Sequence, residues 1–240
     1  MASNQWAAPH TTAPVVGTVA VPGSKSINNR ALILAALSQS PSVLRNVLMA
    51  RDSQLMIDGL RQLGVGIDLI DPTAVAVTPH PLKGPVSIDC GLSGTMMRFV
   101  PPLATLALGD VTFDGDLAAR KRPMETMITA LRKLGASVSD GGRRSLPFTI
   151  HSTGHMPGGS IKIDASASSQ FVSGLLLSGA TFDNGLTIRH VGAQLPSLPH
   201  IDMTVAMLTA AGAHVSANVS DNTDASWSIA SGALDQGDLV

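Results

Sequence analysis

Two sequence markers recur three times along this chain at almost the same spacing. The first is a short hydroxyl-rich turn that opens an apolar helical stretch, and its copies start 69 and 75 residues apart: Ser24-Lys25-Ser26, Ser93-Gly94-Thr95 and Ser168-Ser169-Gln170. The second is a glycine that closes another apolar stretch, with copies 71 and 77 residues apart: Gly64, Gly135 and Gly212. Two independent markers with one pitch predict three copies of a single structural unit.

The hydrophobic pattern predicts the same order of elements, β-α-β-α-β-β, in each unit. In the first unit we expect strands at 15–21, 42–47, 65–70 and 74–77, and helices at 26–37 and 52–63. In the second we expect strands at 86–89, 111–114, 136–139 and 148–151, and helices at 95–108 and 123–134. In the third we expect strands at 160–163, 186–191, 214–218 and 226–229, and helices at 169–178 and 201–211.

Both predicted helices of each unit carry few charges, which is typical of helices enclosed by sheets. Three units packed about a common axis, with helices inside and sheets outside, bury their apolar faces in one α/β domain. We expect this domain at residues 15–232, with repeats at about 15–80, 84–153 and 158–230, after a tail at 1–14. We interpret the apolar, strand-like ending at 233–240 as the truncated start of a connection to a missing second domain.

Composition excludes several classes of function. The formal net charge of −1 provides no general attraction to nucleic acid or to an anionic membrane. The single cysteine, Cys90, excludes a disulfide framework and a metal site built from several cysteines, and we expect it to be a small buried side chain. No stretch approaches the length of a membrane span, and residues 1–18 do not resemble a secretion signal, so the cytoplasm is the expected location.

Positive charges gather where a helix disfavours them. A helix N-terminus carries a partial positive charge, so a cation there is unfavourable unless an anion binds nearby. Six cations lie at or just before predicted helix starts: Lys25, Arg30, Arg98, Arg120, Lys121 and Arg122. Neutral donors accompany them: Ser26, Thr95, Ser168, Ser169 and Ser197. Gly94 lets a ligand approach the main chain closely, and the pattern as a whole predicts anion binding at the helix starts.

Several of these residues also have a structural interpretation. Serine before a helix is usually an N-cap, which applies to Ser24, Ser93 and Ser166. Arg98 can instead pair with a buried carboxylate such as Asp89 or Asp114, and Gly94 can simply mark a turn.

The stretch at 21–31, VPGSKSINNRA, closely resembles the opening motif of the 5-enolpyruvylshikimate-3-phosphate (EPSP) synthase family. Four further stretches resemble the family's other N-terminal motifs in the same order: LSGTMMR at 92–98, RKRPM at 120–124, SASSQF at 166–171 and SLPHID at 197–202. The family consists of two domains of three repeats each, an inside-out α/β barrel. The resemblance therefore implies that this chain is the N-terminal domain of such an enzyme.

The resemblance also implies a reaction. The family transfers the enolpyruvyl group of phosphoenolpyruvate to the 5-hydroxyl of shikimate 3-phosphate through a tetrahedral adduct that loses phosphate, on the pathway to chorismate and aromatic amino acids. It needs no metal or organic cofactor. By resemblance, shikimate 3-phosphate is bound by Lys25, Ser26, Arg30, Ser168, Ser169, Gln170 and Ser197. Phosphoenolpyruvate is bound by Lys25, Gly94, Arg122 and Gln170, with Lys25 as the catalytic residue between the substrates and Thr95 and His200 as further candidates.

The family's acid–base carboxylates belong to the other domain, so we expect this chain alone to bind shikimate 3-phosphate weakly and not to turn over. Gly94, rather than alanine, suggests that a full-length parent admits the herbicide glyphosate in the phosphoenolpyruvate site.

Three positions depart from the commonest family pattern. Leu92 replaces an asparagine, Phe99 a proline and His200 a tyrosine that stacks near the shikimate ring. We expect Phe99 to shift the helix that starts at Gly94 and to loosen the phosphoenolpyruvate pocket. His200 is either a flat wall with pH-dependent charge or an ordinary helix-start residue.

Two other functions stay open. One is the sister enolpyruvyl transferase that acts on UDP-N-acetylglucosamine, but its loop cysteine is missing from residues 117–122. The other is a non-catalytic stand-alone module that binds shikimate 3-phosphate or docks a partner. A natural module should end in a polar tail, whereas this chain stops at an apolar stretch.

Overall fold

Three small sheets form the outside of the fold in a computed structural model, which describes residues 6–19, 21–221 and 223–239. The second repeat has the order β4-β5-β7-β6, from β4 (Val86–Asp89), β5 (Leu108–Asp114), β6 (Ser137–Ser139) and β7 (Phe148–Thr153). The third has the order β10-β11-β9-β8, from β8 (Gly159–Ile163), β9 (Leu186–His190), β10 (Val215–Val219) and β11 (Ala225–Ile229). In both, the first two strands of the repeat pair in parallel and the other pairs are antiparallel.

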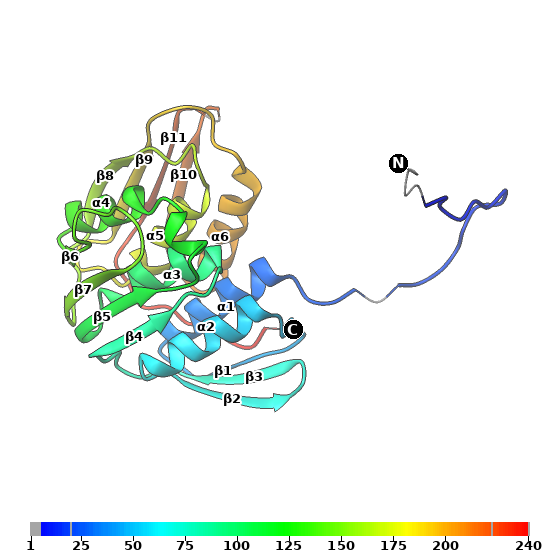
Figure 1. Ribbon diagram of the computed structural model, residues 1–240, viewed down its shortest axis with the longest axis horizontal. Helices are drawn as coiled ribbons and strands as arrows, with labels where there is room; N and C mark the ends of the chain where they lie inside the picture. The colour runs from blue at the N-terminus through cyan, green and yellow to red at the C-terminus, as the bar shows by residue number, and fades with distance from the viewer. Residues whose placement is uncertain (1–5, 20, 222, 240) are drawn as a thin grey trace.

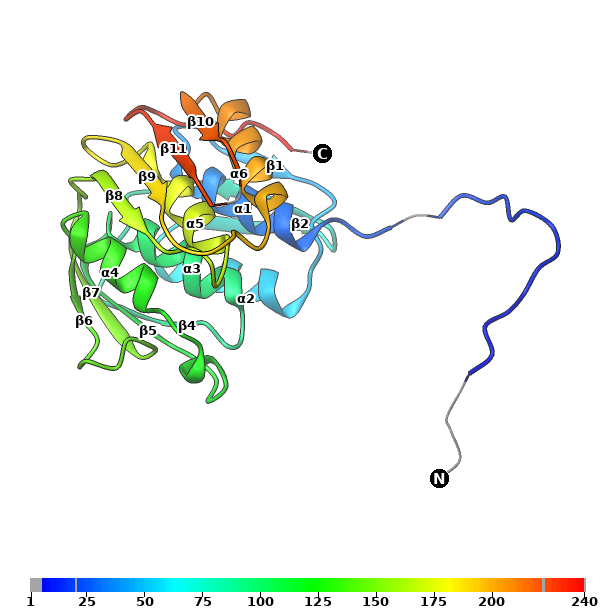
Figure 2. The ribbon, with the colours of Figure 1, turned by 90° about the horizontal axis from the view of Figure 1, so that it is seen from above.

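One helix of each repeat lies inside the sheets. Helices α1 (Lys25–Leu37), α3 (Gly94–Ala104) and α5 (Gln170–Gly179) lie at the centre of Figure 1, and the view from above in Figure 2 keeps them there. Their buried stretches are nearly continuous, at 28–36, 95–104 and 171–179. For these three helices, the prediction of helices inside and sheets outside is confirmed.

The second helix of each repeat is only partly enclosed, and here the prediction was wrong. Helices α2 (Arg51–Gln62), α4 (Glu125–Lys133) and α6 (Leu198–Ala210) each bury one face and leave the rest half-buried or exposed. The residues that each helix buries recur every three or four positions, as with Met127, Ala130 and Leu131 in α4. These outer helices are therefore buried on one side only, whereas the inner helix of each pair is buried all round over most of its length.

The predicted strand at 15–21 is absent from the described residues of that stretch, 15–19 and 21; Ala20 lies outside them. Its valines are almost fully exposed, with 82% for Val15 and 96% for Val16, and the segment runs away from the sheets (Figure 1). A strand needs a partner for its backbone hydrogen bonds, and this segment has none among the described residues. The first sheet therefore has three strands, β1 (Ser42–Leu44), β2 (Gly66–Asp71) and β3 (Ala74–Thr78), in the order β1-β3-β2.

The free edge of β1 is bonded instead by the segment after β11. Arg45 donates its N–H to the Leu239 carbonyl at 2.8 Å, Leu239 donates to the Val43 carbonyl at 3.0 Å, and the pairing is parallel. This segment thus takes the place that β4 and β8 have in the other sheets. The predicted connection to a second domain at 233–240 and the predicted tail at 1–14 stay predictions, and Val240 and residues 1–5 lie outside the described residues.

The other predicted elements are all present, with boundaries that differ by a few residues. The largest difference is α3, which ends at Ala104 rather than 108 because Leu108 already begins β5. The basic stretch before α4 forms a short 3-10 turn, η1 (Ala119–Lys121). None of the helices described is both long and apolar enough to cross a membrane.

Candidate substrate-binding site

The N-terminal ends of four helices meet at one place. The Asn29 amide donates to Thr95 Oγ1 at 2.6 Å, which joins the starts of α1 and α3. Arg30 Nη2 donates to the His200 carbonyl at 2.9 Å, which joins α1 to the start of α6. The start of α5 reaches that of α3 through Gln170, as described below. The fold thus brings together helix starts that are far apart in the sequence, and their free N–H groups and partial positive charges favour an anion.

Three polar side chains converge on Gly94, the first residue of α3. A β-carbon on Gly94 would lie 3.2 Å from Arg98 Nη1, 3.2 Å from Gln170 Oε1 and 3.3 Å from Arg122 Nη1. Arg122 also donates to the Leu92 carbonyl at 3.3 Å, and Arg98 Nη1 to the Gly94 carbonyl at 3.2 Å. Two guanidinium groups and an amide therefore face a stretch of backbone that has no side chain, a suitable arrangement for a small anion with several oxygens.

Two arginines are buried without a carboxylate. Arg30 is 2% exposed and Arg98 8%, and neither forms an ion pair with any side chain described. The predicted alternative partners of Arg98 are occupied elsewhere, since Asp114 binds Arg120 and Asp89 accepts the Gly91 N–H. The alternative that Arg98 is a structural ion-pair residue is thus wrong.

Aromatic rings and neutral acceptors surround these cations instead. The Arg30 Cζ lies 5.1 Å from the centre of the Phe99 ring, and the Arg98 Cζ lies 5.1 Å from that of Phe171. Burial lowers the pKa of Arg30 and of Arg98 to about 10, and the charge of Arg122 adds to the effect on Arg98. Both guanidinium groups therefore stay charged at neutral pH.

Arg30 lies beneath the site, where it links α1 to α5 and α6. Its Nε donates to Thr204 Oγ1 at 2.7 Å, and Nη2 contacts Ser173 Oγ at 3.3 Å besides the His200 carbonyl. Its Nη1 donates to the Ser26 carbonyl at 2.8 Å. Most of its donors are thus used within the protein, whereas Arg98 Nε is buried without a partner.

Lys25, the exposed first residue of α1, lies at the outer edge of this group of helix starts, which we call the rim of the site. Its side chain is about half exposed, and Nζ lies 3.2 Å from Asp52 Oδ2 in the first turn of α2. Ser26 next to it is half-buried. Sequence reasoning missed Asp52, because a carboxylate in the first turn of a helix is ordinary and nothing in the sequence connects it to Lys25.

The hydroxyl groups of the third repeat differ in their surroundings. Ser168 Oγ accepts the Gln170 N–H at 3.2 Å, and Ser169 is buried before α5 without a cap bond from its side chain. Ser197 Oγ lies 3.1 Å from Nδ1 of His200, which is exposed. Thr95 Oγ1 is engaged by Asn29 and lies 3.1 Å from Ser93 Oγ, so this hydroxyl is held within the protein.

The three predicted caps have different outcomes. Ser93 caps α3, since its Oγ accepts the Met96 N–H at 3.3 Å. Ser24 has the N-cap position of α1 but makes no cap bond with its side chain. Ser166 does not cap a helix, because its hydroxyl and N–H both bond to the Asp164 carboxylate.

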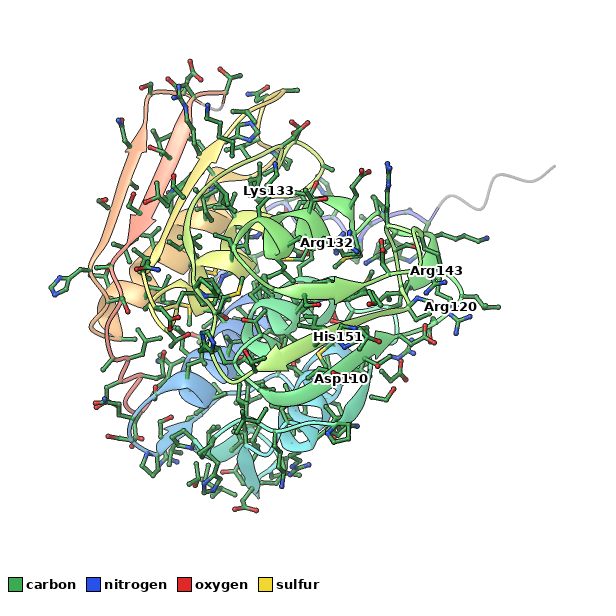
Figure 3. All side chains as sticks on the ribbon, turned by 90° about the vertical axis from the view of Figure 1, so that its left-hand side faces the viewer. Asp110, Arg120, Arg132, Lys133, Arg143 and His151 are labelled. Carbon is green, nitrogen blue, oxygen red and sulfur yellow. The ribbon has the colours of Figure 1, made fainter. Side chains whose placement is uncertain are left out.

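Two of the cations before α4, Arg120 and Arg122, have different surroundings. Arg122 faces Gly94, whereas Arg120 forms a two-pronged ion pair with Asp114, with 2.8 Å from Nε to Oδ1 and 2.6 Å from Nη2 to Oδ2. The pair raises the pKa of Arg120 and lowers that of Asp114. Figure 3 shows Arg120 near Arg143 at one end of the second sheet. The ion pair with Asp114, rather than a bound ligand, therefore accounts for the presence of Arg120 before α4.

Cys90 is a buried thiol, as predicted. Burial is the main reason why its pKa is raised to about 12, with smaller contributions from Asp89 and Asp114. Within the described part of the chain, no three histidine, cysteine or acidic side chains gather closely enough to hold a metal ion.

Comparisons with known proteins show which family and fold this chain resembles. The sequence profile of EPSP synthase (3-phosphoshikimate 1-carboxyvinyltransferase) matches residues 9–236. Two solved structures of EPSP synthase from Acinetobacter baumannii each match the fold with a TM-score of 0.77 and 27% sequence identity over 92% of this chain. The matched part covers 48% of one of those chains and 49% of the other, so this chain spans about half their length.

Proposed function

Because the chain belongs to the EPSP synthase family, we propose that it is the half of a 3-phosphoshikimate 1-carboxyvinyltransferase that binds shikimate 3-phosphate and one side of phosphoenolpyruvate. The observation that carries this proposal is the convergence of Arg98, Arg122 and Gln170 on Gly94. Two polyanionic substrates must lie side by side in this reaction. Cations without carboxylate partners at converging helix N-termini are suited to that task, because a bound anion replaces the missing counter-charge.

Most of the predicted residues keep the roles that the family resemblance implies for them. Lys25, at the rim, lies between the two substrates as the catalytic cation, and Arg122 offers its planar fork to the phosphate of phosphoenolpyruvate. Gln170 reaches both ligands. Shikimate 3-phosphate is held by the hydroxyl-rich group: Ser26, Ser168, Ser169 and Ser197.

Arg30 and Thr95 need an account that differs from the predicted contact with a substrate, and His200 keeps its predicted role. Arg30 has one N–H left on Nη1 after its protein contacts, so it acts on shikimate 3-phosphate mainly by fixing α1, α5 and α6. Thr95 holds Asn29 and so supports the joint between the first and second repeats. His200 is exposed, and its Nδ1 lies 3.1 Å from Ser197 Oγ, which supports the proposal that it forms one wall of the shikimate pocket.

We also propose that this chain does not turn over by itself. The three side chains that converge on Gly94 include no aspartate or glutamate, and the carboxylate of Asp52 is ion-paired with Lys25. Proton transfer needs an available group within about 2.6–3.2 Å of the reacting atoms. The missing acid–base groups and the rest of the phosphoenolpyruvate clamp are expected from a second domain, whose closure would also exclude water.

The buried state of Cys90 argues against the sister transferase. A nucleophilic cysteine must be accessible and ionised, whereas this thiol is fully buried with its pKa raised.

Calorimetric titration of the purified chain with shikimate 3-phosphate at low salt tests the proposal, together with a phosphate-release assay in the presence of phosphoenolpyruvate. We expect saturable binding without phosphate release. Lys25→Met should weaken binding at least tenfold, because it removes an exposed cation from the rim without disturbing the core.

Lys133→Met in the last turn of α4 is the matched control and should bind as the parent does (Figure 3). Equal losses in both variants would mean that only net charge matters. No binding by the parent chain would refute binding by this half alone, and phosphate release would refute its inactivity. Binding that Lys25→Met leaves unchanged would refute the role of the rim.

A further inference from the structure

Two loops of the third repeat carry its predicted ligand-binding hydroxyls. The loop at 164–169 follows β8 and leads to Ser168 and Ser169, and the loop at 191–197 follows β9 and leads to Ser197. Strands β8 and β9 are parallel and pair Ile163 with His190, so both loops leave the same edge of the sheet. The last main-chain bond between them is from the Val191 N–H to the Ile163 carbonyl, at 2.9 Å. Beyond it, side chains must hold the loops together.

The imidazole of His190 joins these two loops. Its Nδ1 accepts the Ala165 N–H at 3.3 Å, and its Nε2 lies 2.7 Å from the Ala193 carbonyl. Because a backbone N–H can only donate, Nδ1 is the acceptor in this bond and Nε2 is the donor to the Ala193 carbonyl. The proton on Nε2 forms the hydrogen bond to the carbonyl oxygen of Ala193. His190 is 1% exposed, so water does not compete for either bond.

Neighbouring groups confirm that the loops are in direct contact at this point. The Ser166 hydroxyl lies 3.0 Å from the same Ala193 carbonyl. A β-carbon on Gly192, whose φ is +138°, would lie 2.5 Å from Asp164 Oδ1. The 191–197 loop thus passes close over the 164–169 loop, where a glycine is needed for both conformation and space.

We propose that His190 is a positioning residue that holds the two loops in the arrangement in which Ser168, Ser169 and Ser197 grip one ligand. The inference rests on the proposed function for its ligand, a phosphorylated cyclic polyol carboxylate such as shikimate 3-phosphate. The ring itself does not reach the ligand, because both of its nitrogens are used within the protein. Without it, each loop keeps its anchoring strand, but of these side-chain links between the loops only the bond from Ser166 to the Ala193 carbonyl remains.

Three variants of the full 240-residue chain separate the two bonds. His190→Leu removes both hydrogen bonds and places an apolar side chain in the buried site. His190→Asn keeps an acceptor at the position of Nδ1, and His190→Gln keeps a donor at the position of Nε2. His214→Leu, at an exposed histidine before β10, is the matched control.

Amide hydrogen exchange of the two loops is the first measurement, and it needs no ligand. We expect His190→Leu to speed exchange at least tenfold in 164–169 and 191–197, with little change in α1 and α3. The Asn variant should restore protection mainly in the first loop and the Gln variant mainly in the second. Unchanged exchange in both loops, or a uniform increase throughout the chain, would overturn the inference.

Calorimetric titration with shikimate 3-phosphate is the second measurement. We expect about tenfold weaker binding in His190→Leu, a loss comparable to that of one or two hydrogen bonds. His190→Asn and His190→Gln should recover part of the affinity, and His214→Leu should bind as the parent does. Faster loop exchange with parental affinity would refute the positioning role. If the parent chain itself does not bind, the proposed function of the isolated chain fails, and loop exchange alone decides whether His190 joins the loops.

Discussion

Replacing Phe99 with leucine should reveal how a carboxylate-free arginine is stabilised in this fold. The Phe99 ring is fully buried and lies 5.1 Å from the guanidinium carbon of Arg30. A cation over a desolvated aromatic face contributes about 2 kcal/mol, and the change to a smaller side chain adds about 1 kcal/mol from lost packing. We therefore expect Phe99→Leu to lower the free energy of unfolding by about 3 kcal/mol and Tm by about 6–12 °C.

A double-mutant cycle separates the cation–π part from packing. The cycle uses Phe99→Leu, Arg30→Met and the double variant, measured by urea unfolding with far-UV circular dichroism and the fluorescence of the buried Trp227. We expect a coupling free energy of about 1.5–2 kcal/mol between the two residues. Coincident transitions from the two probes establish that a single free energy describes the unfolding.

Phe113 provides a matched aromatic control. Its ring is also fully buried, but it stacks on Phe148 at 5.1 Å rather than on a cation. Phe113→Leu combined with Arg30→Met should therefore be additive. A coupling free energy below about 0.5 kcal/mol for the Phe99 pair, or one equal to that of the Phe113 pair, would refute the argument.

Three further predictions concern the site and its surroundings. Gly94→Ala, introduced into a full-length enzyme with both domains, should weaken phosphoenolpyruvate binding about tenfold or more in steady-state KM measurements, because its methyl group would lie 3.2–3.3 Å from three polar atoms. An unchanged KM would contradict this expectation. In the parent enzyme, glyphosate that fails to compete with phosphoenolpyruvate would refute the predicted herbicide site. Cys90 should not react with iodoacetamide in the native chain at pH 8 and should react fully in urea, because burial raises its pKa to about 12; rapid native labelling, measured by intact mass, would show an accessible thiolate. The hydrogen bond from Arg132 is the main reason why the pKa of Asp140 is lowered to about 2. The Asp140 carboxylate therefore stabilises the fold at pH values above the ordinary aspartate pKa near 4, and this stabilisation is lost as the pH falls toward 2. The urea midpoint should fall more between pH 5 and pH 3 in the parent than in Asp140→Asn, and parallel pH profiles would contradict this role of Asp140.

Phe99 also shows how a departure from a family pattern is interpreted differently once the fold is known. From the sequence, an aromatic residue in place of proline was expected to shift α3 and loosen the pocket. In the structure, α3 still begins at Gly94, and the ring packs beneath Arg30. The ring fills space in the core between the inner helices, and a shift of α3 relative to other members of the family stays a prediction.

The strand predicted at 15–21 shows the limit of periodicity. Its valines are typical of a strand, but a strand forms only beside a partner with free backbone groups. The edge of β1 that should have received it is bonded to Leu239, nearly two hundred residues along the chain. Local pattern specifies that a segment can pair, and the tertiary fold decides with which segment.

The sequence by itself determined the three repeats, the order of their elements apart from the strand predicted at 15–21, and the helix starts at or near which Lys25, Gly94, Arg122 and Gln170 lie, because periodicity and capping are properties of neighbouring residues. Only the tertiary structure decided which helix of each repeat is enclosed, that Arg98 has no carboxylate partner while Arg120 has Asp114, and that His190 joins two loops. Those outcomes depend on contacts between residues far apart in the sequence, whose geometry no local pattern contains.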